Sequence, residues 1–317
     1  MGGDEDDGGL DDGALDDGGL GDAESGAAWR PGAGRVVLAG TPIGNPGDAS
    51  SRLRDALATA DVVAAEDTRR LQRLCDALQV RTTGRVVSLH EHNERARSAD
   101  LVAQAAAGAT VLVVTDAGMP TVSDPGYRIV TAAVAAGVTV TTLPGPSAVL
   151  AALAVSGLPT DRFCFEGFPP RRPGERDRAF AALAAEPRTL VFFESPRRTA
   201  ATLTAMAAAS AFGPQRPAAL CRELTKTFEE IRRGTLSELS AHASEVEVLG
   251  EVVLVLGGAS AVAVTGTGPA ELAAAVAAEI EAGTDHKAAV VVVAGRTGLG
   301  RRTVYDAVVA ARHAQRA

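Results

Sequence analysis

The chain has 317 residues, of which 46% are hydrophobic and 3% aromatic, and its formal net charge is −8. This length and apolar content suffice for sizeable cores and favour about two domains. No segment holds the roughly 18 consecutive apolar residues of a membrane span, and the acidic amino terminus lacks the basic start of a signal peptide, so we expect neither.

The acidic excess comes from one low-complexity segment at the amino terminus. Residues 1–28 hold ten acids and no lysine or arginine, which leaves 31 basic against 29 acidic residues in the rest of the chain. The repeated Asp-Asp-Gly-Gly-Leu-like units cannot bury enough apolar surface to offset their ordering entropy. We therefore predict that residues 1–33 are a disordered acidic tail, with shielding of a basic surface as its alternative role.

From Gly34 onward, short strands rich in Val, Leu and Ala alternate with Ala-rich helical stretches, which indicates a mostly parallel α/β domain. This domain is expected to cover residues 34–147. Its predicted strands lie near 35–39, 61–65, 86–89, 110–115 and 138–142.

Two of these strands run into glycine-containing loops, residues 39–48 and 116–126. Ligands of open α/β sheets bind beyond the carboxyl ends of the strands. We therefore expect the two loops to share a pocket, although each could also be only a tight connection. Neither loop has the spacing of a dinucleotide-binding turn or of a P-loop.

A second α/β domain is predicted over residues 148–258, entered through a proline-rich turn in which Ser147 is the expected N-cap of a helix. Residues 259–270 are small and flexible enough to be a linker. Residues 271–317 then fit a compact helical unit with a helix-turn-helix.

The helical unit is basic at its end. From Asp285 onward the chain carries six Arg or Lys against two Asp, which favours contact with phosphate. A phosphate loop at residues 295–300 is disfavoured, because Arg301 and Arg302 replace the required Lys-Ser/Thr. A packing unit that serves dimerisation remains the alternative.

Several polar segments have ordinary explanations beside functional ones. Glu66, Asp67 and Arg69 suit a salt-bridge network at a helix start. His90 and His92 are too few for a metal site, so a solvated loop is favoured there and no metal is expected.

The cysteines and a basic arm complete the candidate features. Cys75, Cys164 and Cys221 are far apart and lack metal-ligand spacing, so we expect reduced core thiols of a cytoplasmic protein. The segment PPRRPGERDR contains Arg171 and Arg172 and is either a solvated loop or a clamp on the phosphates of a polyanion.

Nine motifs, in a fixed order, resemble those of a known family. They are TPIGNPGD, AAEDTRR, SLHEHNE, TDAGMPTVSDPG, LPGPSA, FEGFPPRR, FFESPRR, CRELTKTFEE and GEVVLVLGG, and they span residues 41–258. Over about residues 35–317 the chain resembles the RsmI family of ribosomal RNA small-subunit (cytidine-2′-O)-methyltransferases, within the tetrapyrrole-methylase superfamily. The helical unit resembles the helix-turn-helix-like domain of that family. Two departures are Met119, where the family usually has Thr, and the acidic tail, for which the resemblance supplies no role.

The resemblance implies the two-domain α/β fold of the class III S-adenosylmethionine-dependent methyltransferases. It also implies methyl transfer from S-adenosylmethionine to the ribose 2′-oxygen of a cytidine in the decoding centre of 16S rRNA, within the small ribosomal subunit, and a homodimer. The cofactor would lie in the cleft between the α/β domains. Its neighbours, carried over by motif, would be Pro42, Gly44, Asn45, Asp116, Gly118, Val122, Ser147, Ala148 and Phe168.

For the reaction itself, Lys226 is the candidate group near the 2′-oxygen. With a depressed pKa it would accept the proton or stabilise the alkoxide, while Glu223 and Arg222 would orient it. The residues expected to hold RNA phosphates are Arg69, Arg171, Arg172, Arg197, Arg198, Arg301 and Arg302. The alternatives are a methylase of a tetrapyrrole or other small molecule, and a non-catalytic nucleic-acid-binding regulator.

Overall fold

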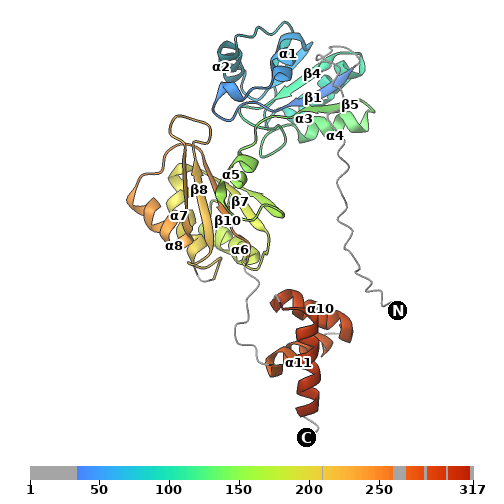
Figure 1. The fold of residues 1–317 in the computed structure, drawn as a ribbon. Helices are drawn as coiled ribbons and strands as arrows, with labels where there is room; N and C mark the ends of the chain where they lie inside the picture. The colour runs from blue at the N-terminus through green and yellow to red at the C-terminus, as the bar shows by residue number, and fades with distance from the viewer. Residues whose placement is uncertain (1–33, 209, 260–268, 282–283, 298, 315–317) are drawn as a thin grey trace, which may run out of the picture.

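The computed structural model describes residues 34–208, 210–259, 269–281, 284–297 and 299–314. The predicted acidic tail and most of the predicted linker lie outside the described residues. Within the described residues the strands form two five-stranded sheets, and a separate helical unit follows them (Figure 1).

The first sheet consists of β1 (Arg35–Ala39), β2 (Val62–Ala65), β3 (Arg85–Ser88), β4 (Thr110–Val114) and β5 (Thr139–Leu143). All five strands run parallel in the order β3-β2-β4-β1-β5, and each lies within one residue of its predicted bounds. The strands were recognisable because β2 and β4 are buried throughout, as is typical of a parallel sheet covered on both faces.

Helices cover both faces of this sheet. A one-turn 3-10 helix, η1 (Pro46–Asp48), precedes α1 (Ser51–Thr59), and α1 and α2 (Thr68–Leu78) pack one apolar cluster against one face. The other face packs against α3 (Glu94–Ala106) and α4 (Tyr127–Ala135). Because β1 lies beside β4, with Ala39 opposite Val114, the two predicted loops leave the sheet side by side.

The second sheet is mixed. It contains β6 (Phe163–Gly167), β7 (Thr189–Glu194), β8 (Pro217–Arg222), β9 (Glu230–Thr235) and β10 (Val252–Leu256) in the order β6-β7-β10-β8-β9. Only the β6–β7 pair is parallel among these described strands. The polar edge strand β9, with the sequence EIRRGT, was not predicted, because it has no apolar run and its side chains are half-buried or exposed.

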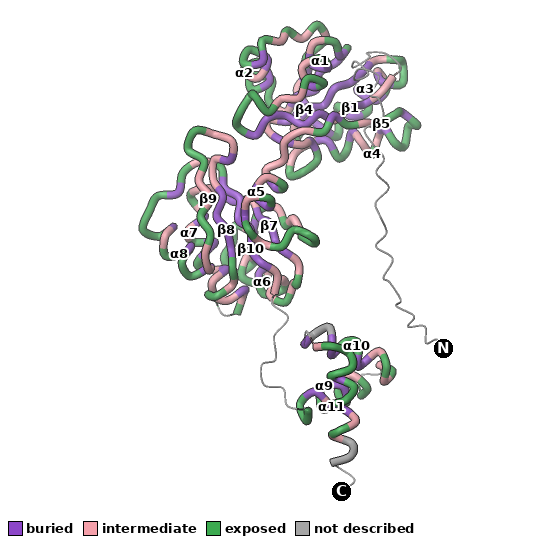
Figure 2. Tube along the Cα trace, in the orientation of Figure 1, coloured by how far each residue is buried: buried purple, intermediate pink, exposed green. Residues whose placement is uncertain are grey.

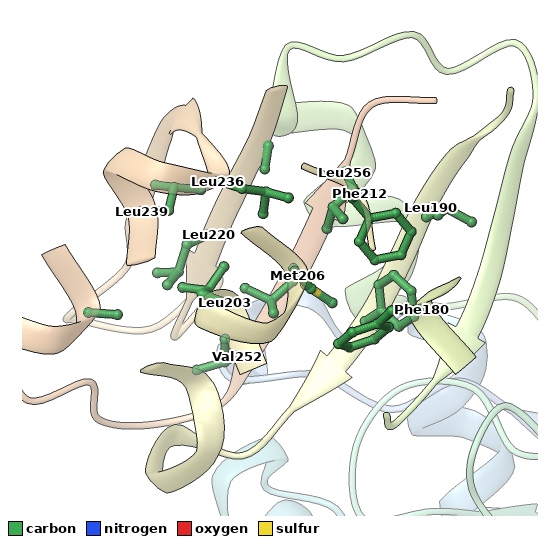
Figure 3. Packing of buried hydrophobic residues seen from close by; sticks show 14 of the residues in the cluster. Phe180, Leu190, Leu203, Met206, Phe212, Leu220, Leu236, Leu239, Val252 and Leu256 are labelled. Carbon is green, nitrogen blue, oxygen red and sulfur yellow. The ribbon is translucent and has the colours of Figure 1, made fainter. Parts of the chain in front are cut away.

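Two apolar clusters sandwich this sheet. One face is covered by three helices, α6 (Pro173–Leu183), α7 (Pro196–Ala207) and α8 (Leu236–Glu245). Their cluster includes Phe180, Leu203 and Met206, which Figure 3 shows packed together. The other face packs against α5 (Ala148–Ser156), and Ile43 from the first sheet's loop joins that cluster. The buried strands at the centre of both sheets appear in Figure 2.

The helical unit comprises α9 (Pro269–Glu281), α10 (His286–Thr297) and α11 (Arg301–Ala314) around an apolar cluster of its own. Helix α9 begins two residues before the predicted start of the unit. Helices α10 and α11 follow each other as the helix-turn-helix pattern predicts. Among the described helices none is long and apolar enough to cross a membrane.

Candidate functional site

A cavity of about 430 Å³ lies where the carboxyl ends of the parallel strands meet the second sheet. The first sheet contributes Ile43, Glu66 and the loop after β4, from Asp116 to Asp124. The second contributes Phe168 and the segments 193–196 and 250–253, and residues 147–149 connect the two. Both predicted loops therefore line one cavity between the two sheets.

Close backbone contacts hold together the loops beside this cavity. Thr41 and Gly118 exchange backbone hydrogen bonds of 2.9 and 3.1 Å, which join the loop after β1 to the loop after β4. Gly40 and Gly145 also touch, since a Cβ added at Gly145 would come within 2.7 Å of the Gly40 carbonyl oxygen. Neither position tolerates a side chain without a backbone shift.

One wall of the cavity is acidic. The N–H of Asp116 donates to Glu66 Oε2 at 3.3 Å, and Arg70 Nε lies 3.3 Å from Asp116 Oδ2. Burial raises the pKa of Glu66 and that of Asp116, although the Arg70 guanidinium opposes the rise at Asp116. Burial, together with the charges of Glu66 and Asp116, raises the pKa of Asp124 to about 7.

The loop that carries Asp124 is held in an unusual conformation. Thr121 and Ser123 have positive φ angles of 77° and 64°, which non-glycine residues rarely adopt. The buried carboxylate of Glu94 fixes the far end of the loop, because the N–H groups of Gly126 and Arg128 both donate to its Oε1 at 2.9 Å. Such strain persists only where the surroundings impose it.

Another part of the lining, the apolar wall, consists of hydrophobic side chains. Phe168 stands edge-on to Phe193 with ring centroids 5.6 Å apart, and Val122 and Val149 also face the cavity. Ser147 is the N-cap of α5, as predicted, but its side chain makes no capping hydrogen bond and instead lines the cavity.

Of the nine predicted cofactor neighbours, six line this cavity: Asp116, Gly118, Val122, Ser147, Ala148 and Phe168. Pro42 lies behind the acidic wall, in a small hollow that it shares with Glu66 and Asp116. Gly44 and Asn45 lie instead against the loop after β8, where the Asn45 N–H donates to Thr225 Oγ1 at 3.1 Å. Their roles stay predictions.

The structure corrects the expectation for Lys226. Its Nζ lies 2.8 Å from Glu223 Oε1 and 3.1 Å from Glu251 Oε2. Burial would lower the pKa of Lys226, but these two carboxylates outweigh it and raise the pKa, so the expected depression is wrong. Arg222 does not orient Lys226 either, because its Nε pairs with Glu230 at 2.7 Å.

The predicted RNA-binding arginines differ in whether their side chains are exposed or already bound within the fold. Arg198 is engaged inside the fold, with its Nη2 3.0 Å from the buried Glu194 carboxylate and 2.7 Å from the Pro169 carbonyl oxygen, so the structure does not support it as a phosphate contact. Arg172 pairs with Glu175 on the surface at 3.1 Å. The exposed ones are Arg69, Arg171, Arg172, Arg197, Arg301 and Arg302.

Sequence reasoning missed three functional candidates: Glu66 and Arg70 as cavity residues, and Asp124 as an acid with an altered pKa. The available signal was the lone acid in the polar turn TVSDPG, within the loop that follows the buried strand β4. Among the described residues no group of three or more His, Cys, Asp and Glu could hold a metal ion.

Comparison with known proteins first identifies the class of protein to which the chain belongs. Residues 35–240 match the family model described as Tetrapyrrole (Corrin/Porphyrin) Methylases. A structure of uroporphyrin-III C-methyl transferase from Thermus thermophilus, complexed with S-adenosylhomocysteine, shares the fold, with a TM-score of 0.50 and 23% identity over 71% of this chain and 97% of that chain.

Two curated relatives identify the family within this class. Ribosomal RNA small subunit methyltransferase I of Mycobacterium tuberculosis (strain CDC 1551 / Oshkosh) is 52% identical over 88% of this chain and 96% of its own length. The protein of the same name from Mesorhizobium japonicum is 48% identical over 73% of this chain and 78% of its own length. The chain therefore belongs to the ribosomal RNA small subunit methyltransferase I family, which confirms both the predicted fold class and the predicted family.

Proposed function

We propose that the protein transfers a methyl group from S-adenosylmethionine to the ribose 2′-oxygen of a cytidine in the decoding centre of 16S rRNA. It would act in the cytoplasm, as a homodimer, on the small ribosomal subunit. The observation that carries the proposal is the 52% identity to a small-subunit rRNA methyltransferase over nearly the whole of that relative.

The cavity suits S-adenosylmethionine in size and in chemistry. Its volume of about 430 Å³ falls within the range of small-molecule sites. The acidic wall, formed by Glu66, Asp116 and Asp124 with one partly opposing cation at Arg70, favours the sulfonium and ammonium charges. The apolar wall at Phe168 and its neighbours offers a slot for adenine.

When bound, the cofactor supplies an activated methyl group on sulfur. The chain's own contribution is then chiefly positional, because collinear alignment of oxygen, methyl carbon and sulfur supplies much of the rate in such a displacement. The contacts between Gly40 and Gly145 and between Thr41 and Gly118 fix the loops beside the cavity for this alignment.

The charge distribution also suits an RNA substrate whose phosphates stay outside. Carboxylates in the cavity repel phosphate, so only the ribose and its base can approach. The exposed Arg69, Arg171, Arg172 and Arg197 would hold flanking phosphates. Arg301 and Arg302, at the start of α11, would bind a more distant phosphate.

The test is incubation of the purified protein with radiolabelled S-adenosylmethionine and small subunits that lack the modification, followed by mapping of the labelled nucleotide. Label on a cytidine ribose in the decoding centre is the expected result, and already modified subunits serve as the control. Absence of RNA labelling despite cofactor binding would favour a small-molecule methylase or a non-catalytic regulator.

A matched pair of phenylalanine variants tests the location of the cofactor. Phe168→Ala removes a ring from the cavity wall, whereas Phe163→Ala removes one from the other end of β6. We expect calorimetry with S-adenosylhomocysteine to show weaker binding only for Phe168→Ala. Equal binding by both variants would move the cofactor out of this cavity.

A further inference from the structure

Five carboxylates line the cavity, and four of them already have partners. Glu194 accepts hydrogen bonds from Ser195 N, Arg198 and Thr202 at 2.6–3.0 Å. Glu251 pairs with Lys226. These two acids are therefore neutralised or saturated within the second sheet.

The other two partnered acids belong to the first sheet. Asp116 accepts from the Asp67 N–H at 3.2 Å and pairs with Arg70. Glu66 accepts from the Asp116 N–H. Each of these carboxylates ties the end of β2 to the end of β4, which is a structural task.

Asp124 is different, because it has no hydrogen bond or ion pair with any described residue. It lies half-buried in the cavity wall, between Ser123 with its positive φ and Pro125. The Glu94 contact to Gly126 fixes the loop from the other side. The fold thus presents one unpaired carboxylate to the cavity on a backbone that has little freedom to turn it away.

We propose that Asp124 is the catalytic base, which accepts the proton of the ribose 2′-hydroxyl as that oxygen attacks the methyl carbon. This inference rests on the proposed function. The oxygen–hydrogen bond breaks and the proton passes to the Asp124 carboxylate, an oxygen–carbon bond forms, and the carbon–sulfur bond breaks with its electron pair staying on sulfur. The products are the 2′-O-methyl ribose, S-adenosylhomocysteine and a protonated Asp124, which returns its proton to water.

The electrostatic surroundings suit this role. Asp124 faces Glu66 at the end of β2 and Asp116 at the end of β4, and the cation that lines the same cavity, Arg70 on α2, is paired with Asp116. Burial and these two negative charges bring the pKa of Asp124 to about 7, where a carboxylate is half ionised and a stronger base than an ordinary one. Lys226, held protonated by Glu223 and Glu251, could not accept the proton near neutral pH.

The experiment measures single-turnover methylation of unmodified small subunits between pH 5.5 and 8.5, at saturating radiolabelled S-adenosylmethionine. The wild-type rate should rise about tenfold per pH unit below about pH 7 and then level off. Asp124→Asn should lower the rate about 10²- to 10³-fold and lose that pH dependence, since general bases contribute on this order. Asp100→Asn, the same change on the exposed face of α3, should match the wild type.

Cofactor affinity separates catalysis from binding. Asp124→Asn should bind S-adenosylhomocysteine within about threefold of the wild type. A wild-type rate and pH profile in Asp124→Asn would overturn the proposal, and so would a loss of rate explained entirely by lost cofactor binding. If the wild type labelled no RNA at all, the proposed function itself would fail and the inference with it.

Discussion

Ionisation of Asp124 should destabilise the folded protein at high pH. Replacing Asp124 should show by how much the free energy of unfolding changes. Burial next to Glu66 and Asp116 raises its pKa from 3.8 to about 7. The folded protein therefore binds the Asp124 proton more tightly than the unfolded chain does. The stability that this bound proton contributes to the folded state is fully present below about pH 4 and is lost as the pH rises through about 7.

The size of the effect follows from the pKa change. One pH unit corresponds to about 1.4 kcal/mol, so ionising Asp124 in the fold costs at most about 4 kcal/mol once the pH is above 7. Asp124 is only half-buried, so solvent screens its charge and leaves about 1–2 kcal/mol as the expected change in unfolding free energy between pH 5 and 8. Asp124→Asn removes the charge and keeps the shape, so it should gain this amount relative to the wild type over that range.

The assay is urea unfolding followed by circular dichroism at pH 5, 6, 7 and 8, on wild type, Asp124→Asn and the control Asp100→Asn. We expect the advantage of Asp124→Asn to grow with pH and to stop growing above about pH 7. A constant difference across this range, or an advantage largest at pH 5, would refute the reasoning that the cavity destabilises the Asp124 charge.

Three further substitutions probe how the cavity is built. Glu94→Gln should weaken the buried contact to the Gly126 N–H by about 1–3 kcal/mol, as expected for a hydrogen bond to a charged group, and hydrogen exchange at that amide should speed up accordingly. Gly145→Ala should destabilise the protein by about 1–3 kcal/mol in urea unfolding, because its methyl group would strike the Gly40 carbonyl oxygen; unchanged stability would contradict the close contact. Lys226→Arg should keep most of the single-turnover methylation rate, since arginine preserves the charge but cannot act as a base; a loss beyond about 100-fold would restore the base role to Lys226.

The sequence specifies the first sheet well, because its strands are continuous apolar runs followed by turns. β2 and β4 are buried on both faces, so their composition alone marks them. β9 escaped prediction for the opposite reason. It lies at a sheet edge and its charged residues pair with each other, as Arg232 does with Glu230, so neither an apolar run nor a clean alternation marks it.

Prediction of the site depended on how far apart its parts lie in the chain. The loop after β4 was recognisable by itself, since turn residues follow a buried strand. The pKa of Asp124 was not, because it depends on burial and then on the charges of Glu66 and Asp116, and Glu66 lies far away in the sequence and arrives only when β2 pairs with β4. The mistake about Lys226 has the same origin. Lys226 has one carboxylate partner nearby in the sequence, Glu223, but Glu251, directly before β10, adds a second one that also raises the pKa of Lys226.

The acidic wall of the cavity and the exposed arginines together suggest how one turnover ends. S-adenosylmethionine carries a sulfonium charge that the acidic wall attracts, whereas the product thioether is neutral and loses that attraction. Neutralising Asp124 by the transferred proton should change product affinity by no more than about threefold, as expected for Asp124→Asn. The lost sulfonium charge therefore accounts for most of the weaker hold on the product, while the exposed arginines proposed to hold phosphate are unaffected. The proposed reaction thus lowers cofactor affinity through the charge lost from sulfur, without requiring the RNA to leave first.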